Sequence, residues 1–264
     1  GESSGSIAQR RLHRDHLPRI REIVRGDITK HREAIVVAAE RLAPGFRVED
    51  PATRERQMRA ALRVVQEPPR GISAFLSSPM TFLAAIDPEG IVIARDTDPD
   101  PMKGKDFGSE YPVIASALEN AAVGYSLVEF EGMTEEDQSS FSLVFAAPAR
   151  IEGETVGAVA LGIPLWSLSK RINQQLRVEL HSEFQQGAVV WVYFYRGDRL
   201  FHRGTPPDLD KAVPGAEQRA EGLARSPGGY TGKLAVLGRE YGYAVLPMPS
   251  LGEDVGVVAI RGEP

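Results

Sequence analysis

The sequence contains no cysteine among its 264 residues, which excludes disulfide bonds, thiolate metal sites and cysteine nucleophiles. It also lacks any run of about 18 apolar residues, so no segment of this chain is predicted to span a membrane. A strong excess of one charge is missing too: 31 Lys and Arg stand against 36 Asp and Glu, for a net charge of −5. That balance argues against a nucleic-acid-binding protein.

The short motifs of common enzyme classes are also absent. There is no G-x-S-x-G, no G-x-G-x-x-G, no phosphate-binding loop and no H-E-x-x-H. Ser167 and Lys170 match S-x-x-K, but the companion motifs of acyl-serine enzymes do not follow. We interpret both as helix-surface residues and predict no catalytic residues, no enzyme activity and no cofactor.

One acidic stretch has the spacing of calcium ligands. Asp96, Asp98 and Asp100 alternate as the first ligands of a calcium loop do. However, Pro101 stands where such a loop needs glycine, and Phe107 stands where it needs glutamate. We therefore predict a turn-rich loop and no metal site.

Helical periodicity dominates the beginning of the chain. Apolar residues recur at three- and four-residue steps from 7 to 43, opposite a face of Arg, Glu and Asp, which predicts one long helix. Pro18 lies inside this pattern, so we expect a kink there or a true start near Arg19. The arginines of this helix lack neighbouring aromatic residues or a helix-turn-helix, so we interpret them as a solvated face. A second helix is predicted to start at Asp50-Pro51.

From Thr81 the apolar period changes to two, which predicts strands. The expected strands are 81–87, 91–96, 125–131, 140–150 and 155–165, with a short helix at 111–120. After a helix at 166–184, the order repeats in shortened form with strands 188–195, 199–203, 229–238, 239–249 and 254–262 and a weak helix at 215–225. Val156–Val159 matches Val255–Val258 at an offset of 99 residues, and Pro148 matches Pro247 at the same offset. We infer an α+β fold with a divergent duplication.

Three motifs occur in an order that resembles a known family. They are AAIDPEGIVIARDTD (84–98), Asp106-Phe107-Gly108 followed by Tyr111, and FAAP (145–148) followed by VGAV (156–159). Together they resemble the double-Cache sensor domains, the PAS-like extracytoplasmic modules of bacterial chemoreceptors and sensor kinases. The resemblance implies a helical stalk and second helix (1–80), a membrane-distal ligand-binding lobe (81–165), a connecting helix (166–186) and a smaller membrane-proximal lobe (187–264).

The resemblance also implies a function and a location. We expect a piece of a membrane-anchored receptor that acts in chemotaxis or signal transduction on the periplasmic or extracellular side of the inner membrane. Its partners would be a small-molecule ligand and a second copy of the chain, with no nucleic acid. Whether the output is a methyl-accepting receptor or a histidine kinase stays open. The alternatives are a secreted or periplasmic hydrolase and a structural dimerising spacer.

The first lobe supplies the candidate binding residues. A cation beside a phenol and aromatic walls suits a small carboxylate, because the cation offsets the desolvated charge. Amino-acid-sensing members of the family are expected to carry Arg and Trp at the start of the loop helix, where this chain reads GSEYP (108–112), so we expect a short acid instead of an α-amino acid. The candidate ligand-binding residues are Arg95, Lys103, Lys105, Tyr111, Tyr125, Phe130, Phe141 and Phe145.

The second lobe is expected to have no ligand pocket of its own. Its loop between the hairpin and the third strand is short and Pro-rich, which leaves little chain for a lid. We predict that its aromatic residues fill its core or its contact with the first helix; these are Trp191, Tyr193, Tyr195, Phe201 and Tyr243.

Overall fold

The computed structural model describes residues 1–77, 80–130 and 141–264. Its first helical stretch consists of α1 (Ser4–Arg11), a π-helical turn η1 (Leu12–His16) and α2 (Leu17–Leu42), followed by a 3-10 turn η2 (Ala43–Arg47). The long helix predicted over residues 7–43 is confirmed. The expectation of a true start near Arg19 is wrong, because the helix already begins at Ser4, where the Ser3 side chain caps it.

Pro18 is accommodated by the π-turn that precedes it. The backbone N–H of Leu17 donates to the carbonyl of Leu12, five residues back instead of four. Proline lacks an N–H and its ring crowds the preceding turn, so a wider turn lets the helix continue past it. The sequence located the irregularity correctly, but the helix widens there and does not end.

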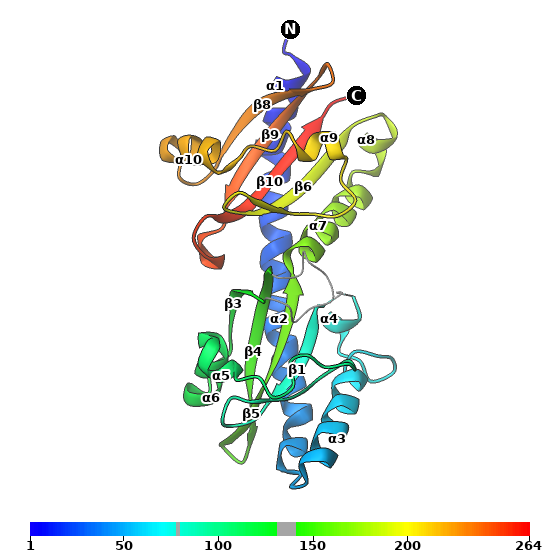
Figure 1. Ribbon diagram of the computed structural model, residues 1–264. Helices are drawn as coiled ribbons and strands as arrows, with labels where there is room; N and C mark the ends of the chain where they lie inside the picture. The colour runs from blue at the N-terminus through cyan, green and yellow to red at the C-terminus, as the bar shows by residue number, and fades with distance from the viewer. Residues whose placement is uncertain (78–79, 131–140) are drawn as a thin grey trace. The chain divides into compact units, whose positions relative to one another are not determined.

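The described residues form two compact units, each with its own sheet. One unit is Gly26–Pro164, and the other joins Gly1–Arg25 to Leu165–Pro264. Each sheet has five antiparallel strands (Figure 1), which confirms the predicted α+β fold with two sheet lobes. No helix among the described residues is long and apolar enough to cross a membrane.

The first sheet belongs to the unit Gly26–Pro164. Its strands are β1 (Phe82–Ile86), β2 (Val92–Arg95), β3 (Gly124–Glu129), β4 (Phe141–Ile151) and β5 (Glu154–Pro164), in the order β2-β1-β5-β4-β3. The helices of this unit besides α2 are α3 (Pro51–Val64), α4 (Ser73–Leu76), α5 (Phe107–Glu110) and α6 (Pro112–Asn120). The ends predicted for two strands at 131 and 140 lie outside the described residues.

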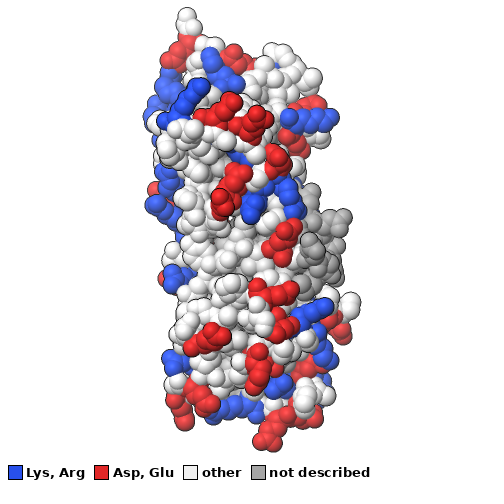
Figure 2. All heavy atoms as spheres, turned by 60° about the vertical axis from the view of Figure 1, so that its left-hand side comes forward, with Lys and Arg blue, Asp and Glu red and all other residues white. Residues whose placement is uncertain are grey.

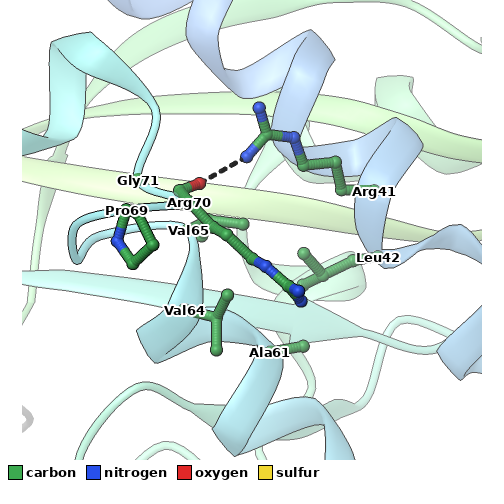
Figure 3. Close-up of a pocket in the computed structure, with 8 residues that line it drawn as sticks. All are labelled: Arg41, Leu42, Ala61, Val64, Val65, Pro69, Arg70 and Gly71. Carbon is green, nitrogen blue, oxygen red and sulfur yellow. Dashed lines mark hydrogen bonds between the residues drawn. The ribbon is translucent and has the colours of Figure 1, made fainter.

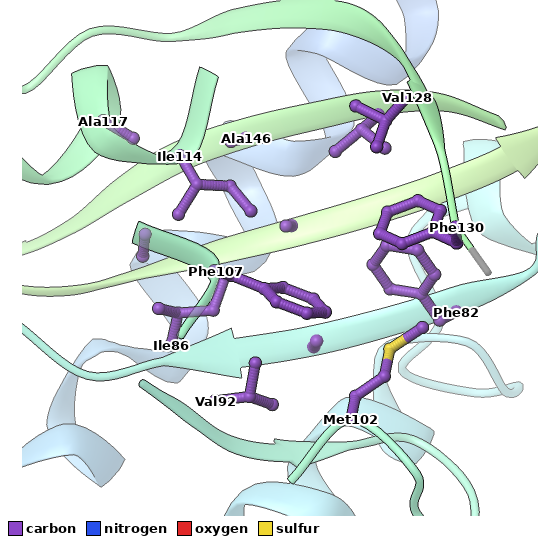
Figure 4. Packing of buried hydrophobic residues seen from close by; sticks show 14 residues of the cluster. Phe82, Ile86, Val92, Met102, Phe107, Ile114, Ala117, Val128, Phe130 and Ala146 are labelled. Atoms are coloured by element: carbon purple, nitrogen blue, oxygen red, sulfur yellow. The ribbon is translucent and has the colours of Figure 1, made fainter. Parts of the chain in front are cut away.

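Short helices cover one face of this sheet. Phe107 of α5 and Ile114 and Ala117 of α6 pack against side chains of β1, β4 and β5 in one buried cluster (Figure 4). On the opposite face, His31 of α2 contacts Phe145 of β4, with ring centroids 5.8 Å apart. The first sheet is therefore buried on both faces, and we call the two the α5–α6 face and the α2 face.

The second sheet belongs to the other unit. Its strands are β6 (Val189–Arg196), β7 (Arg199–Phe201), β8 (Tyr230–Val236), β9 (Arg239–Pro247) and β10 (Val255–Gly262), in the order β7-β6-β10-β9-β8. Its helices besides α1 are α7 (Leu165–Glu179), α8 (His181–Gln185), α9 (Pro207–Asp210) and α10 (Ala216–Arg225), with a 3-10 turn η4 (Pro249–Leu251) before β10. As predicted, Tyr193, Tyr195 and Tyr243 lie in its core cluster, Trp191 packs against that cluster, and Phe201 is buried.

The two sheets repeat the same strand order, and the repeated V-G pair has a packing reason. A Cβ on Gly157 would lie 2.7 Å from the Ile86 carbonyl oxygen, and a Cβ on Gly256 would lie 2.4 Å from the Leu246 carbonyl oxygen. Only glycine allows either approach. The pairing register differs by one residue, because Gly157 pairs with Ala149 while Gly256 pairs with Pro247.

Acidic and basic side chains are interspersed on the face drawn in Figure 2. Arginines of the first helical stretch pair with carboxylates of their own unit: Arg11 with Glu183 at 2.7 Å and Arg19 with Glu179 at 2.6 Å. These carboxylates offset part of the positive charge of the helix face.

Candidate functional site

The side chain of Arg95 lies on the α5–α6 face of the first sheet. Arg95 pairs with Ala84, whose side chain belongs to the buried cluster on that face. The register shifts between Ala85 and Ile86, and such a bulge changes which side chains point to a given face. Only 6% of Arg95 is exposed, so a charged guanidinium is buried beside an apolar surface.

The guanidinium is partly satisfied by neighbouring groups. Its Nε donates to Asp96 Oδ1 at 3.2 Å, and its Nη2 donates to the Thr81 carbonyl at 2.7 Å. The Asp96 carboxylate is shared, because it also accepts from the Leu83 N–H and the Gln66 side chain. The Nη1 of Arg95 has no hydrogen bond to any described residue, so this group keeps donors for a further acceptor.

Two hydroxyls accompany Arg95. Thr81 Oγ1 and Ser142 Oγ are 3.3 Å apart, and Ser142 is fully buried. Ser142 is two residues from Val144, a member of the cluster on the α5–α6 face, so strand alternation places both on that face. We call Thr81, Arg95 and Ser142 the polar end of this face.

Aromatic rings pack together with aliphatic side chains on the rest of this face. Phe82 and Phe130 meet edge to face with centroids 5.2 Å apart, Phe107 and Tyr111 meet at 5.0 Å, and Tyr111 and Phe130 lie 5.2 Å apart. Figure 4 shows Phe82, Phe107 and Phe130 pointing toward one another. Burial, and secondarily Glu110, raises the pKa of Tyr111 to about 12, so its phenol stays protonated at neutral pH.

Three of the predicted aromatic residues lie on the opposite face. Tyr125 pairs with Phe145, and Glu129 pairs with Phe141. Because side chains alternate along a strand, these residues face away from the α5–α6 cluster, and Phe145 contacts His31 of α2. The structure thus joins Arg95, Tyr111 and Phe130 on one face and separates Tyr125, Phe141 and Phe145 from them.

The two predicted lysines are exposed. Lys103 pairs with Glu55 of α3 at 2.7 Å, and 55% of its side chain is exposed. The carbonyl of Lys105 accepts from the Val92 N–H, which holds the backbone of the loop to β2. Neither residue is part of the buried cluster.

Asp100 organises the loop that follows β2. Its carboxylate accepts from the backbone N–H groups of Arg95, Met102 and Lys103 and pairs with Arg59 of α3 at 2.9 Å. Its oxygens therefore hold the loop in place. No group of three or more metal-ligating side chains occurs within the described ranges 1–77, 80–130 and 141–264.

Thr81, Ser142 and Asp100 are the residues of this region that sequence reasoning missed as parts of the site. For Ser142 the period of two was available as evidence, since it lies two residues from Val144 in a buried strand and therefore shares its face. Thr81 and Asp100 lie outside strands, so their positions depend on loop geometry that no periodicity encodes.

Solved structures with a similar fold belong to bacterial sensor proteins. The sensor domain of the V. cholerae histidine kinase DctB has a TM-score of 0.54 and 13% identity, over 96% of this chain and 96% of that chain. A domain of a sensory box/GGDEF family protein from Vibrio parahaemolyticus has a TM-score of 0.59 and 13% identity, over 97% and 96%. The ligand-binding domain of the Campylobacter jejuni chemoreceptor Tlp3, in complex with L-valine, has a TM-score of 0.53 and 8% identity, over 97% and 96%.

No protein-family model and no curated relative matches the sequence. At these identities the likeness concerns the fold, and fold alone does not establish function. The chain shares its fold with these solved sensor domains, as the order of its motifs suggested.

Proposed function

We propose that this chain is the extracytoplasmic sensor domain of a membrane-anchored signalling receptor, and that a short carboxylic acid binds at the polar end of the first sheet. The observation that carries the proposal is the buried Arg95, set beside two hydroxyls on a face that is otherwise apolar and aromatic. A buried cation is costly unless it is paired. Asp96 supplies part of that pairing, and a ligand carboxylate would supply more.

The ligand carboxylate would accept from Arg95 Nη1 and from the Thr81 hydroxyl, whose oxygen lies 3.3 Å from Ser142 Oγ. Its short apolar body would face Phe82 and Phe130, where water is already excluded. The solved structures of similar fold include one with L-valine and one with asparagine. For this chain we favour an acid without an α-amino group.

Binding would act on the receptor through a population shift. A ligand that touches both the sheet and the α5–α6 segment favours the conformation in which that segment is closed over the sheet. We further propose a parallel homodimer formed along the first helix in the anchored receptor, where the anchors raise the local concentration. Sedimentation of a zipper-fused chain tests the dimer, and a species that stays monomeric at high concentration contradicts it.

Calorimetric titration of the purified chain tests the ligand proposal. The panel is acetate, propionate, lactate, pyruvate, succinate and several amino acids, and we expect saturable binding of at least one of the acids. Arg95→Lys should abolish that binding while it keeps a cation near Asp96, because lysine lacks the planar fork that holds a carboxylate. Lys105→Gln, which removes an exposed cation from the same loop, is the matched control and should bind normally.

The alternatives give different results. If a neutral or cationic compound binds saturably and no acid does, the proposal of a carboxylate ligand is contradicted. The proposal of a sensor domain then still stands. Absence of any ligand favours the structural spacer, and turnover of a compound favours an enzyme.

A further inference from the structure

The unit Gly26–Pro164 also has a groove lined by residues of two helices and a turn. This groove of about 480 Å³ lies between the end of α2, the end of α3 and the turn after α3 (Figure 3). Its apolar lining consists of Leu42, Ala61, Val64, Val65 and Pro69. Arg41 and Arg70 also line it, and no carboxylate side chain does so among the described residues. We call it the α2–α3 groove.

Local contacts hold the groove in shape. The Ile72 N–H donates to the Val65 carbonyl at 2.8 Å and closes the turn. Arg41 Nη1 donates to the Arg70 carbonyl at 2.6 Å and ties the turn to α2. Gly71 lets the turn pack closely, because a Cβ there would lie 2.6 Å from a Leu76 methyl and 3.0 Å from the Glu67 carbonyl oxygen, and both would have to shift. The groove is thus preformed, which lowers the entropy lost on binding.

The groove leaves apolar surface in water. Val64 on its wall is 43% exposed, and Leu76, which lies against Gly71, is 49% exposed. Covering such surface is favourable. Figure 3 shows the Arg70 side chain running across the groove toward Leu42 and Ala61, so a cation lies directly over the apolar lining.

We propose that the α2–α3 groove binds an amphiphilic anion, a carboxylate carried on an alkyl chain. The chain would cover Leu42, Val64 and Val65, and the carboxylate would accept from Arg41 and Arg70, whose guanidiniums suit planar anions. Apolar walls with a few convergent polar groups are typical of small-molecule sites, and the volume lies in their usual range. The site is separate from the one proposed at Arg95 and does not depend on it.

Methyl NMR of the full chain, labelled at Ala, Leu and Val, tests the proposal with sodium octanoate as the probe. We expect saturable shifts at Ala61, Leu42, Val64 and Val65. Arg41→Gln and Arg70→Gln should each weaken octanoate about tenfold, the effect of losing a charge-assisted hydrogen bond. Arg56→Gln, an exposed arginine elsewhere on α3, is the matched control and should leave the affinity unchanged.

Two further probes separate the alkyl chain from the charge. 1-Octanol has the chain without the carboxylate and should bind about tenfold more weakly, and acetate has the carboxylate without the chain and should cause no saturable shift at these methyls. Val64→Glu, at an exposed position, should repel octanoate without disturbing the fold. The proposal is overturned if octanol binds as tightly as octanoate, if both arginine variants bind normally, or if no saturable shift appears at the groove.

Discussion

Asp100 and Lys103 lie three residues apart in one loop, yet their surroundings predict different energetic roles. The Asp100 carboxylate is 4% exposed and accepts three backbone N–H groups besides its pair with Arg59. The Lys103 side chain is 55% exposed and makes one ion pair. Hydrogen bonds to a buried charge contribute far more than an exposed pair does.

Asp100→Ala should therefore lower the free energy of unfolding by about 3 kcal/mol or more, since it leaves buried donors unsatisfied. Lys103→Gln should lower it by less than about 1 kcal/mol. Urea unfolding of the two variants beside the wild type measures both values. Equal effects would show that the loop does not depend on the Asp100 carboxylate.

His16 predicts a dependence of stability on pH. It is 4% exposed in the π-turn, and its Nε2 lies 2.8 Å from Nη1 of the fully buried Arg261. Arginine can only donate, so this nitrogen accepts and His16 is neutral. Burial, followed by the charge of Arg261, lowers its pKa to about 4. The other charged groups that act on it are Arg11, Asp15, Glu183 and Glu263.

Because the pKa of His16 in the folded chain lies below its unfolded value, the unfolded chain takes up a proton first. Neutral His16 therefore contributes on the order of 3 kcal/mol to the free energy of unfolding. This contribution is complete above pH 6.5 and is lost as the pH falls toward 4. His16→Gln keeps an acceptor for Arg261 but does not titrate. Urea unfolding from pH 7 to pH 4 should show that the variant loses less free energy of unfolding than the wild type. If the free energies of both proteins fall in parallel with pH, the role assigned to His16 is contradicted.

At the scale of elements, strands and helices follow from sequence because their periods are local. The patterns at 81–87 and 91–96 predicted the β1–β2 hairpin, and the pattern at 111–120 predicted α6. What the sequence did not supply was the grouping of the aromatic residues. Tyr125 and Phe130 are five positions apart, an odd number, and they lie on opposite faces of the sheet. The bulge in the β1–β2 pairing, which brings Arg95 opposite Ala84, depends on pairing geometry that no single-strand pattern contains.

The end of α6 offers a test of local backbone strain. Its C-cap, Ala121, has φ 52° and ψ 35°, in the left-handed region that glycine adopts without steric cost. Ala121→Gly should stabilise the chain by up to about 1 kcal/mol. Ala115→Gly, inside the same helix, should destabilise it by about 1 kcal/mol. Thermal unfolding of both variants should show melting temperatures shifted in opposite directions from that of the wild type. A shift in the same direction in both variants would refute the interpretation that Ala121 is strained.

For the molecule as a whole, the sequence predicted four consecutive segments, whereas contacts in the structure join Gly1–Arg25 to Leu165–Pro264. The first helical stretch belongs in part to each unit, because α1 packs on β8, β9 and β10 while His31 of α2 contacts the first sheet. Contacts between segments so distant in sequence leave no periodic trace. Two units with separate cores can also unfold separately, so a binding energy in one unit need not shift the transition of the other.

The central claim is that a short carboxylate binds at Arg95, and the melting temperature of the whole chain with and without each acid of the panel tests it most directly. A ligand at about one hundred times its dissociation constant adds roughly 2.7 kcal/mol to the folded state. For a chain of this size that raises the melting temperature by about 5–10 °C, or raises only the transition of the unit Gly26–Pro164 if the two units melt apart. The account predicts such a rise with at least one acid in the wild type and in Lys105→Gln, and none in Arg95→Lys. A rise that persists in Arg95→Lys, or no rise with any acid, would contradict it.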